Sequence, residues 1–464
     1  MNKFFFTLAL TLCSIMAVNA QIKGQEMEKY RRSSLNMICL EDPRVDPAVF
    51  QYVRDAFLAN PMPAKYNDHA VDAALRIVSM NDIEVGEADY AESLEAMDAK
   101  KKKDGVKGAK TAGAIVGALG ALAGQAMGPS NEDLRMENLE IDTVKRWIPH
   151  VAHKYFKDTN MAKLVVDKWF GVESGKINLD LVRERAMLNA TEMEKKIAEE
   201  SSDLSVESYI MDNGGLEVIG NTFVTISRFR LLTAEEMAAE IVENAAIAAN
   251  FLPQQLADAA ITAAEIPAAA IIATGGTFIN TNTYLFRLVW NDEVYAHINS
   301  CANDIDKYNA LDLFKLEFIG QENAHASTTV GGKKRTEEEG IKYATARALD
   351  KVLAKLEKEY EVFRTKVPLI EVDPVMKAEI GTKECVEKGD KYEILEKVMK
   401  LDKETNKYTV DYKRVGVITV DEVGNNMGEN NDDENASSNT YTTFKGKAPK
   451  NATKGMLIRY TKGK

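Results

Sequence analysis

The hydrophobic period of the chain changes abruptly at Thr222, and this change limits its possible folds more than any other feature. From Thr222 to Arg230 the side chains alternate between two faces, with Phe223 and Phe229 on one face and Val224 and Ile226 on the other. A period of two predicts a β-strand. Because helical periods precede and follow this strand, the sequence predicts an α+β protein.

The part of the chain that precedes this strand is predicted to be mainly helical. In the N-terminal region, residues 21–98, apolar side chains recur at helical spacing, and the run 69–80 is predicted to form one helix. Residues 36–40 are the exception, since they suit a short buried strand. A second helical block is expected over residues 131–202.

An alanine-rich insertion follows the strand. From residue 231 to residue 276, 16 of 46 residues are alanine, and Pro253 and Pro267 interrupt the run. Alanine has the highest helix propensity, whereas proline disfavours a helix interior. The pattern therefore predicts two or three helices inserted between strands. Thr233 and Glu236 have the spacing of a capping box that starts the first of these helices.

Strands and one long helix complete the middle domain, which is expected to span residues 131–367 together with the preceding helical block. Residues 282–290 alternate as a strand does, and residues 316–320 suit a third strand. Thr336 and Glu339 form a second capping-box pattern. It predicts a long helix that stops before Pro368.

The last region, residues 368–464, is predicted to be a small β-barrel-like domain. Short strand patterns alternate there with turns rich in glycine, aspartate and lysine. The expected strands are residues 377–380, 391–397, 408–412, 414–420, 441–445 and 456–460. The polar stretch 424–440 is expected to be a mobile loop.

The first 20 residues have the pattern of a secretory signal peptide. Lys3 precedes an apolar run from Phe4 to about Val18, and Ala20 ends a short segment of small residues. The run is shorter than the roughly 20 residues that span a membrane. We expect cleavage after Ala20 and a mature protein in the periplasm, associated with the outer membrane, or secreted.

The charge and the cysteine content exclude some classes of function and limit the number of disulfides. The chain carries 59 basic and 71 acidic residues, a formal net charge of −12, which argues against nucleic acid as a partner. Beyond the leader there are three cysteines, Cys39, Cys301 and Cys385, so at most one disulfide can form. No cofactor and no zinc motif is indicated.

Residues 99–130 are predicted to be a lysine-rich hinge followed by a segment rich in glycine and alanine. No charged residue lies between Thr111 and Ser130. Glycines spaced by four residues allow helices to approach closely. Two interpretations remain open: a soluble linker, or a segment that contacts a membrane or a second copy of the chain. The candidate contact residues are Gly113, Gly117, Gly120, Gly124 and Gly128.

Few residues suggest chemistry. His150 and His153 have the spacing of two metal ligands on one helical turn, but no carboxylate at a fixed spacing accompanies them. The sequence contains no nucleophile elbow, zincin motif or Walker loop, so catalytic residues remain unidentified. Aromatic side chains are frequent at binding surfaces, but they also fill cores. The aromatic candidates are Trp169, Tyr284, Phe286 and Trp290.

Several segments resemble known proteins. Residues 164–191, 213–236, 284–292 and 345–369 resemble a family of secreted bacterial envelope proteins without an assigned activity. The tail, with "AEIGTKECVEKGDKYEILEK" and "YKRVGVITVDEV", resembles the C-terminal β domain of flagellar assembly protein T. The resemblance implies a small barrel and a periplasmic scaffold, and it brings no catalytic residues to this chain.

The sequence therefore predicts an exported scaffold or interaction protein of the cell envelope, without catalytic activity, that binds an envelope protein. The alternative is a hydrolase or a ligand-binding protein of the periplasm.

Overall fold

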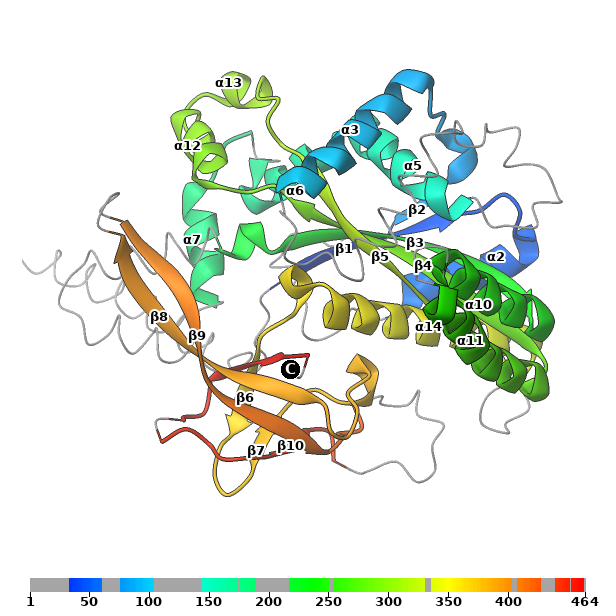
Figure 1. Ribbon diagram of the computed structural model, residues 1–464. Coiled ribbons are helices and arrows are strands. Elements are labelled where there is room, and N and C mark those ends of the chain that lie inside the picture. The colour runs from blue at the N-terminus through cyan, green and yellow to red at the C-terminus, as the bar shows by residue number, and fades with distance from the viewer. Residues whose placement is uncertain are drawn as a thin grey trace, which may run out of the picture.

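The fold combines a five-stranded sheet covered by helices with a closed barrel (Figure 1). The computed structural model describes residues 33–60, 76–103, 144–172, 175–188, 217–249, 254–329, 335–402, 407–426, 439–450 and 452–462. Helices and strands both contribute large parts of these residues, so the predicted α+β class and the C-terminal barrel are confirmed.

The central sheet has the strand order β2-β1-β3-β4-β5. Strand β1 is parallel to both of its neighbours, whereas β3, β4 and β5 form an antiparallel meander. The strands are β1 (Ser34–Glu41), β2 (Arg76–Ser79), β3 (Thr222–Thr233), β4 (Thr277–Leu288) and β5 (Leu316–Ser327). The predicted strands in the middle domain and at residues 36–40 are therefore confirmed.

Helices cover both faces of this sheet, and the alternation in β3 explains how. Phe223 and Phe229 pack towards α2 (Pro47–Ala59) and α14 (Glu337–Glu359), whereas Val224 and Ile226 belong to the core on the opposite face. Because both faces are buried, each set of alternating side chains enters a hydrophobic core. On the second face lie α3 (Glu87–Lys103), α5 (Val144–Asp158), α6 (Met161–Trp169), α7 (Leu179–Leu188), α12 (Asp292–Ser300) and α13 (Ile305–Asn309) (Figure 1).

Two local predictions in the N-terminal region are wrong. The helix expected over residues 69–80 is not continuous, because Arg76–Ser79 form β2 and Met80–Asp82 form the short 3-10 helix η1. Pairing with β1 outweighs the helical spacing of the apolar residues here. The expected hinge begins inside a helix, since Lys100–Lys103 form the last turn of α3. Lysine favours helices and suits their C-terminal end.

The alanine-rich insertion between β3 and β4 is confirmed as a pair of helices. They are α10 (Ala234–Ala249) and α11 (Gln254–Thr274). The expected capping box exists: Glu236 accepts a hydrogen bond from the Thr233 backbone N–H at 2.7 Å, and the Glu236 N–H donates to Thr233 Oγ1 at 3.2 Å. Pro267 lies inside α11 and does not break it.

The C-terminal barrel is closed in the order β10-β7-β6-β11-β8-β9. Its strands are β6 (Val367–Glu371), β7 (Met376–Ala378), β8 (Lys391–Asp402), β9 (Lys407–Glu422), β10 (Thr442–Lys445) and β11 (Leu457–Tyr460). The two strands expected at 408–412 and 414–420 are one strand, β9, and its pairing with β8 shifts register between Ile394 and Leu395. The β8–β9 hairpin projects beyond the barrel (Figure 1).

The barrel is fixed to the sheet through the end of α14 and the 3-10 helices η4 (Glu361–Phe363) and η5 (Thr382–Glu384). Phe363 is fully buried. Its ring packs edge-on against the ring of Phe223 on β3, with 4.9 Å between the ring centroids. Lys358 of α14 donates to the Cys385 carbonyl at 2.9 Å and pairs with Asp390 at 3.1 Å. The segment that leads to the barrel therefore packs on the sheet, and polar contacts join α14 to the barrel side.

Candidate functional site

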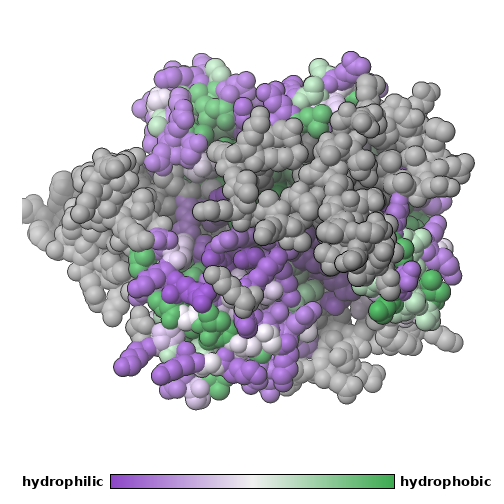
Figure 2. All heavy atoms as spheres, viewed as in Figure 1, coloured by the Kyte–Doolittle hydropathy of each residue, from purple (hydrophilic) through white to green (hydrophobic). Residues whose placement is uncertain are grey.

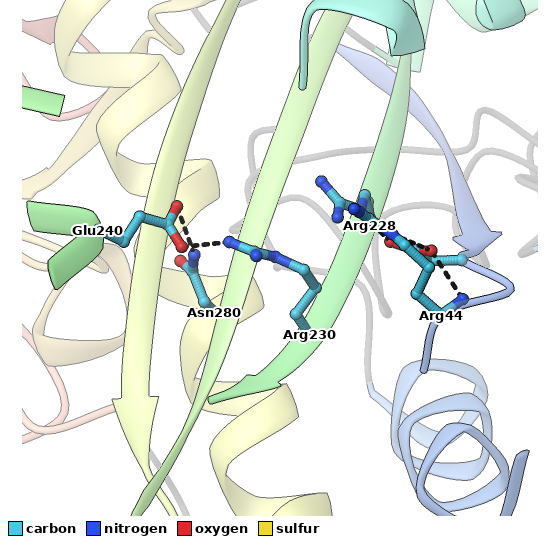
Figure 3. Close-up of polar contacts among 6 residues, drawn as sticks. Arg44, Arg228, Arg230, Glu240 and Asn280 are labelled. Atoms are coloured by element: carbon cyan, nitrogen blue, oxygen red, sulfur yellow. Dashed lines mark hydrogen bonds and ion pairs between the residues drawn. The ribbon is translucent and has the colours of Figure 1, made fainter. Parts of the chain in front are cut away.

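A buried charged cluster joins the end of β1 to β3 (Figure 3). Arg228 Nε donates to Asp42 Oδ2 at 2.6 Å, and both side chains are at most 1 % exposed. Arg44 adds two side-chain hydrogen bonds to Asp42, at 3.1 and 2.9 Å. Burial would raise the pKa of Asp42, but the charge of Arg228 and the contacts with Arg44 lower it to about 2. Such a carboxylate is too weak a base for proton transfer at neutral pH.

A second polar cluster anchors the inserted helices to the sheet (Figure 3). Glu240 of α10 pairs with Arg230 of β3 and accepts a hydrogen bond from Asn280 of β4 at 3.0 Å. Beside it, Met237 and Ile271 pack against Phe278 in a small apolar cluster. Hydrogen bonds and apolar contacts together fix the orientation of α10 and α11 relative to the sheet.

The two predicted histidines of α5 have different surroundings. His150 is buried, and its Nδ1 lies 2.5 Å from Ser93 Oγ of α3. Burial lowers the pKa of His150 to about 4, so the ring is neutral at pH 7. His153 instead lies 3.6 Å from Glu92 Oε1. In the part of the chain that the structure describes, no three metal-ligating side chains come together.

Ser93 and His150 form a hydroxyl–imidazole pair, but they lack the setting of a nucleophile. Ser93 is 1 % exposed and also donates to the Tyr90 carbonyl at 2.9 Å. The Tyr90 ring lies 4.4 Å from that of His150, and the Trp147 ring lies 5.5 Å from it. Aromatic rings therefore enclose the pair, and it serves packing between α3 and α5.

The predicted aromatic residues lie mostly in the core. Trp169 is fully buried, and its Nε1 donates to Thr222 Oγ1 at 2.9 Å. Tyr284 and Phe286 of β4 are also buried, so their alternation reflects core packing. Trp290 is half-buried, with its ring 6.1 Å from that of Phe170. These side chains do not form an exposed aromatic surface.

The glycines proposed for close contact, Gly113, Gly117, Gly120, Gly124 and Gly128, lie outside the described residues. Among the helices that the structure describes, none is long and apolar enough to cross a membrane.

An exposed apolar face on α11 was missed by the sequence interpretation. Ile266 is 73 % exposed and Ile272 is 51 % exposed, whereas Ala268 and Ile271 of the same helix are buried. Apolar side chains gather over this end of the molecule in Figure 2, where α10 and α11 lie. The other exposed residues in this part of α11 are Ala263, Glu265, Pro267, Ala269, Ala270, Ala273 and Thr274, so its outer side is mainly apolar. The alanine-rich composition could have indicated this face, because a helix with so few polar residues must expose apolar ones on its outer side.

Two cavities lie where the helices, the sheet and the barrel meet. One, of about 500 Å³, lies between α2 and α14 beside η5, and Asn60, Asp350 and Lys383 line it. The other, of about 340 Å³, lies between the sheet and the barrel and is lined mainly by polar and charged side chains. Neither could be predicted from the sequence, because their linings come from distant segments.

Comparison with protein-family models and with curated proteins adds no relative. No protein-family model and no curated protein sequence matches the chain.

Proposed function

We propose that this chain is a non-catalytic interaction protein of the bacterial cell envelope, and that α11 binds its protein partner. The exposed apolar face of α11 carries this proposal. Exposed apolar side chains cost free energy in water and are frequent at protein-binding sites. The signal-peptide pattern and the resemblance of residues 368–464 to a periplasmic scaffold domain support the envelope location and the scaffold role.

The support beneath α11 suits a docking surface. Glu240, Arg230 and Asn280 connect the neighbouring helix α10 to the sheet, and Ile271 packs α11 against the same cluster. A surface that is already ordered loses little conformational entropy when a partner binds. Burial of one isoleucine stabilises a complex by about 2 kcal/mol, so Ile266 and Ile272 together could change affinity by more than about 100-fold.

The test compares three forms of the mature protein as bait in envelope extracts. These are the wild type, the double variant Ile266→Lys/Ile272→Lys, and Leu58→Lys as control. Leu58 is 44 % exposed on α2, so the control places one lysine on another exposed apolar position. We expect one protein to be captured by the wild type and the control and lost with the double variant. Its purified form should bind the double variant at least about 100-fold more weakly.

Equal capture by all three forms would contradict the role of α11. The location is tested separately, by fractionating cells and sequencing the mature N-terminus. We expect a periplasmic, outer-membrane or released protein that begins at Gln21, and retention of Met1 would contradict export.

A further inference from the structure

The smaller cavity, of about 340 Å³, combines basic side chains from the sheet with others from the barrel and its linker. Arg287 comes from β4, Arg364 and Lys366 come from the linker between η4 and β6, and Arg459 comes from β11. Among the described residues that line the cavity, Glu361 is the one acidic residue. The cavity is therefore lined by four cationic side chains and one acidic side chain, whereas the protein as a whole has a net charge of −12.

Two of the four cations already have carboxylate partners. Arg459 contacts Glu393 at 2.6 Å and Glu361 at 3.3 Å. Lys366 lies 3.8 Å from Glu217 Oε1. These pairs hold the side chains in place and neutralise much of their charge.

Arg287 and Arg364 differ from those two cations, because neither forms an ion pair with any residue in the described part of the chain. Arg287 Nε donates to the Gly220 carbonyl at 2.7 Å, and Arg364 Nη2 donates to the Lys358 carbonyl at 3.1 Å. Arg364 Nε is buried and has no hydrogen-bond partner among the described residues. Burial lowers the pKa of Arg287, although the nearby charge of Glu317 opposes this effect. Both guanidinium groups therefore have unused hydrogen-bonding capacity beside the cavity.

A bound anion would balance the positive charge and accept hydrogen bonds from these unused donors. A buried donor without an acceptor costs free energy, and Arg364 Nε is such a donor. Guanidinium groups hydrogen-bond oxyanions through paired N–H donors, and such charge-assisted bonds are stronger than neutral ones. Asn221 and Ser33 also line the cavity and add an amide and a hydroxyl group.

We propose that this cavity binds a small phosphate-type oxyanion, either inorganic phosphate or the phosphoryl group of a small phosphate monoester. The volume suits a ligand at the small end of the usual range of about 300–1,000 Å³. A tetrahedral anion presents oxygens in several directions, so it can accept hydrogen bonds from Arg287 on the sheet and from Arg364 on the barrel side. The bound anion would connect the two parts of the molecule and stabilise their junction.

The experiment titrates inorganic phosphate into the full mature chain by calorimetry, with sodium chloride of equal ionic strength as reference. The variants are Arg287→Gln and Arg364→Gln. Arg414→Gln is the matched control, because Arg414 is exposed on β9 and does not line the cavity. We expect saturable binding by the wild type and the control, at least tenfold weaker binding by the two cavity variants, and a rise in Tm with phosphate but not with chloride.

Glycerol phosphate serves as the second ligand and distinguishes the two sources of the anion, since tighter binding of the ester identifies a phosphate monoester. If Arg287→Gln does not fold, Arg287→Lys replaces it, because lysine keeps the charge but removes the planar pair of donors. Absence of saturable binding of both ligands by the wild type would overturn the proposal, and so would equal binding by all the variants. Neither result bears on the surface of α11, which is tested by capture.

Discussion

At the scale of single residues, the charges buried in this protein differ in how well they are compensated. Asp42 has two arginine partners, and its pKa is low. Asp350 of α14 is 7 % exposed, and its Oδ1 has no hydrogen-bond partner among the described residues. Burial raises the pKa of Asp350 to about 6, although Lys383 and Arg347 oppose this effect. The ionised Asp350, beside the larger cavity, therefore destabilises the folded protein.

We predict that Asp350→Asn stabilises the protein at neutral pH. The native carboxyl group binds its proton more tightly than the unfolded chain does, so the free energy of unfolding falls as pH rises from 3.8 through about 6. The variant lacks this loss and should be more stable by about 3 kcal/mol at pH 8. The difference should disappear at about pH 4 and below. Urea unfolding at several pH values measures it, with the exposed Asp312→Asn as control. A pH-independent difference would contradict the explanation.

At the scale of elements, the contact between β5 and the end of α14 depends on a glycine. A Cβ atom on Gly320 would lie 2.2 Å from Cζ of Tyr360. The Tyr360 ring cannot easily move, because its hydroxyl accepts from the Gln321 N–H and donates to the Gln321 carbonyl, each at 3.0 Å. The register shift between Leu285 and Phe286, opposite this part of β5, lies beside the same contact. The glycine lets helix and strand approach closely.

We predict that Gly320→Ala destabilises the protein by about 3 kcal/mol, because the added methyl group overlaps a ring that two hydrogen bonds hold. Gly220→Ala is the matched control, since its added Cβ would meet nothing closer than 3.8 Å. The free energies of unfolding in urea should differ between the variants by about 3 kcal/mol. Similar values for both variants would show that the ring adjusts without cost.

At the scale of the whole molecule, the sheet and the barrel are joined by a small set of buried contacts. Phe363 of η4, in the segment that leads from α14 to the barrel, is fully buried and belongs to the sheet-side core cluster that contains Phe223 and Leu356. The polar contacts of Lys358 with Cys385 and Asp390 lie nearby. The two parts should therefore unfold together as long as this junction is intact.

We predict that Phe363→Ala uncouples the two parts. Loss of a buried phenylalanine costs about 3–5 kcal/mol. Because Phe363 fixes the segment between α14 and β6 to the sheet-side core, its loss should loosen the link to the barrel, and thermal unfolding measured by calorimetry should change from one transition to two. Val362→Ala is the control, since Val362 is 45 % exposed on the same short helix and should leave a single transition. A single transition at lower temperature in Phe363→Ala would mean that sheet and barrel do not unfold independently.

The sequence alone determined the features that local chemistry controls. The alternation at Thr222–Arg230, the capping residues Thr336 and Glu339, and the alanine-rich insertion identified β3, α14 and the helix pair. In each case the signal and the structure lie within a few residues, so periodicity and capping are sufficient. The α+β class could be predicted for the same reason. The barrel was expected from its short strand patterns and from the resemblance, although its closure pairs distant segments such as β6 and β11.

Only the tertiary structure decided the features that depend on distant partners. Pairing with β1 made Arg76–Ser79 a strand, and contact with Tyr360 explains Gly320. The exposed face of α11 is defined by which side the sheet covers, and the basic cavity exists because Arg287 and Arg364, far apart in the chain, meet at the junction of sheet and barrel. Burial and charge balance depend on which neighbours surround a side chain, and a linear pattern does not contain that information.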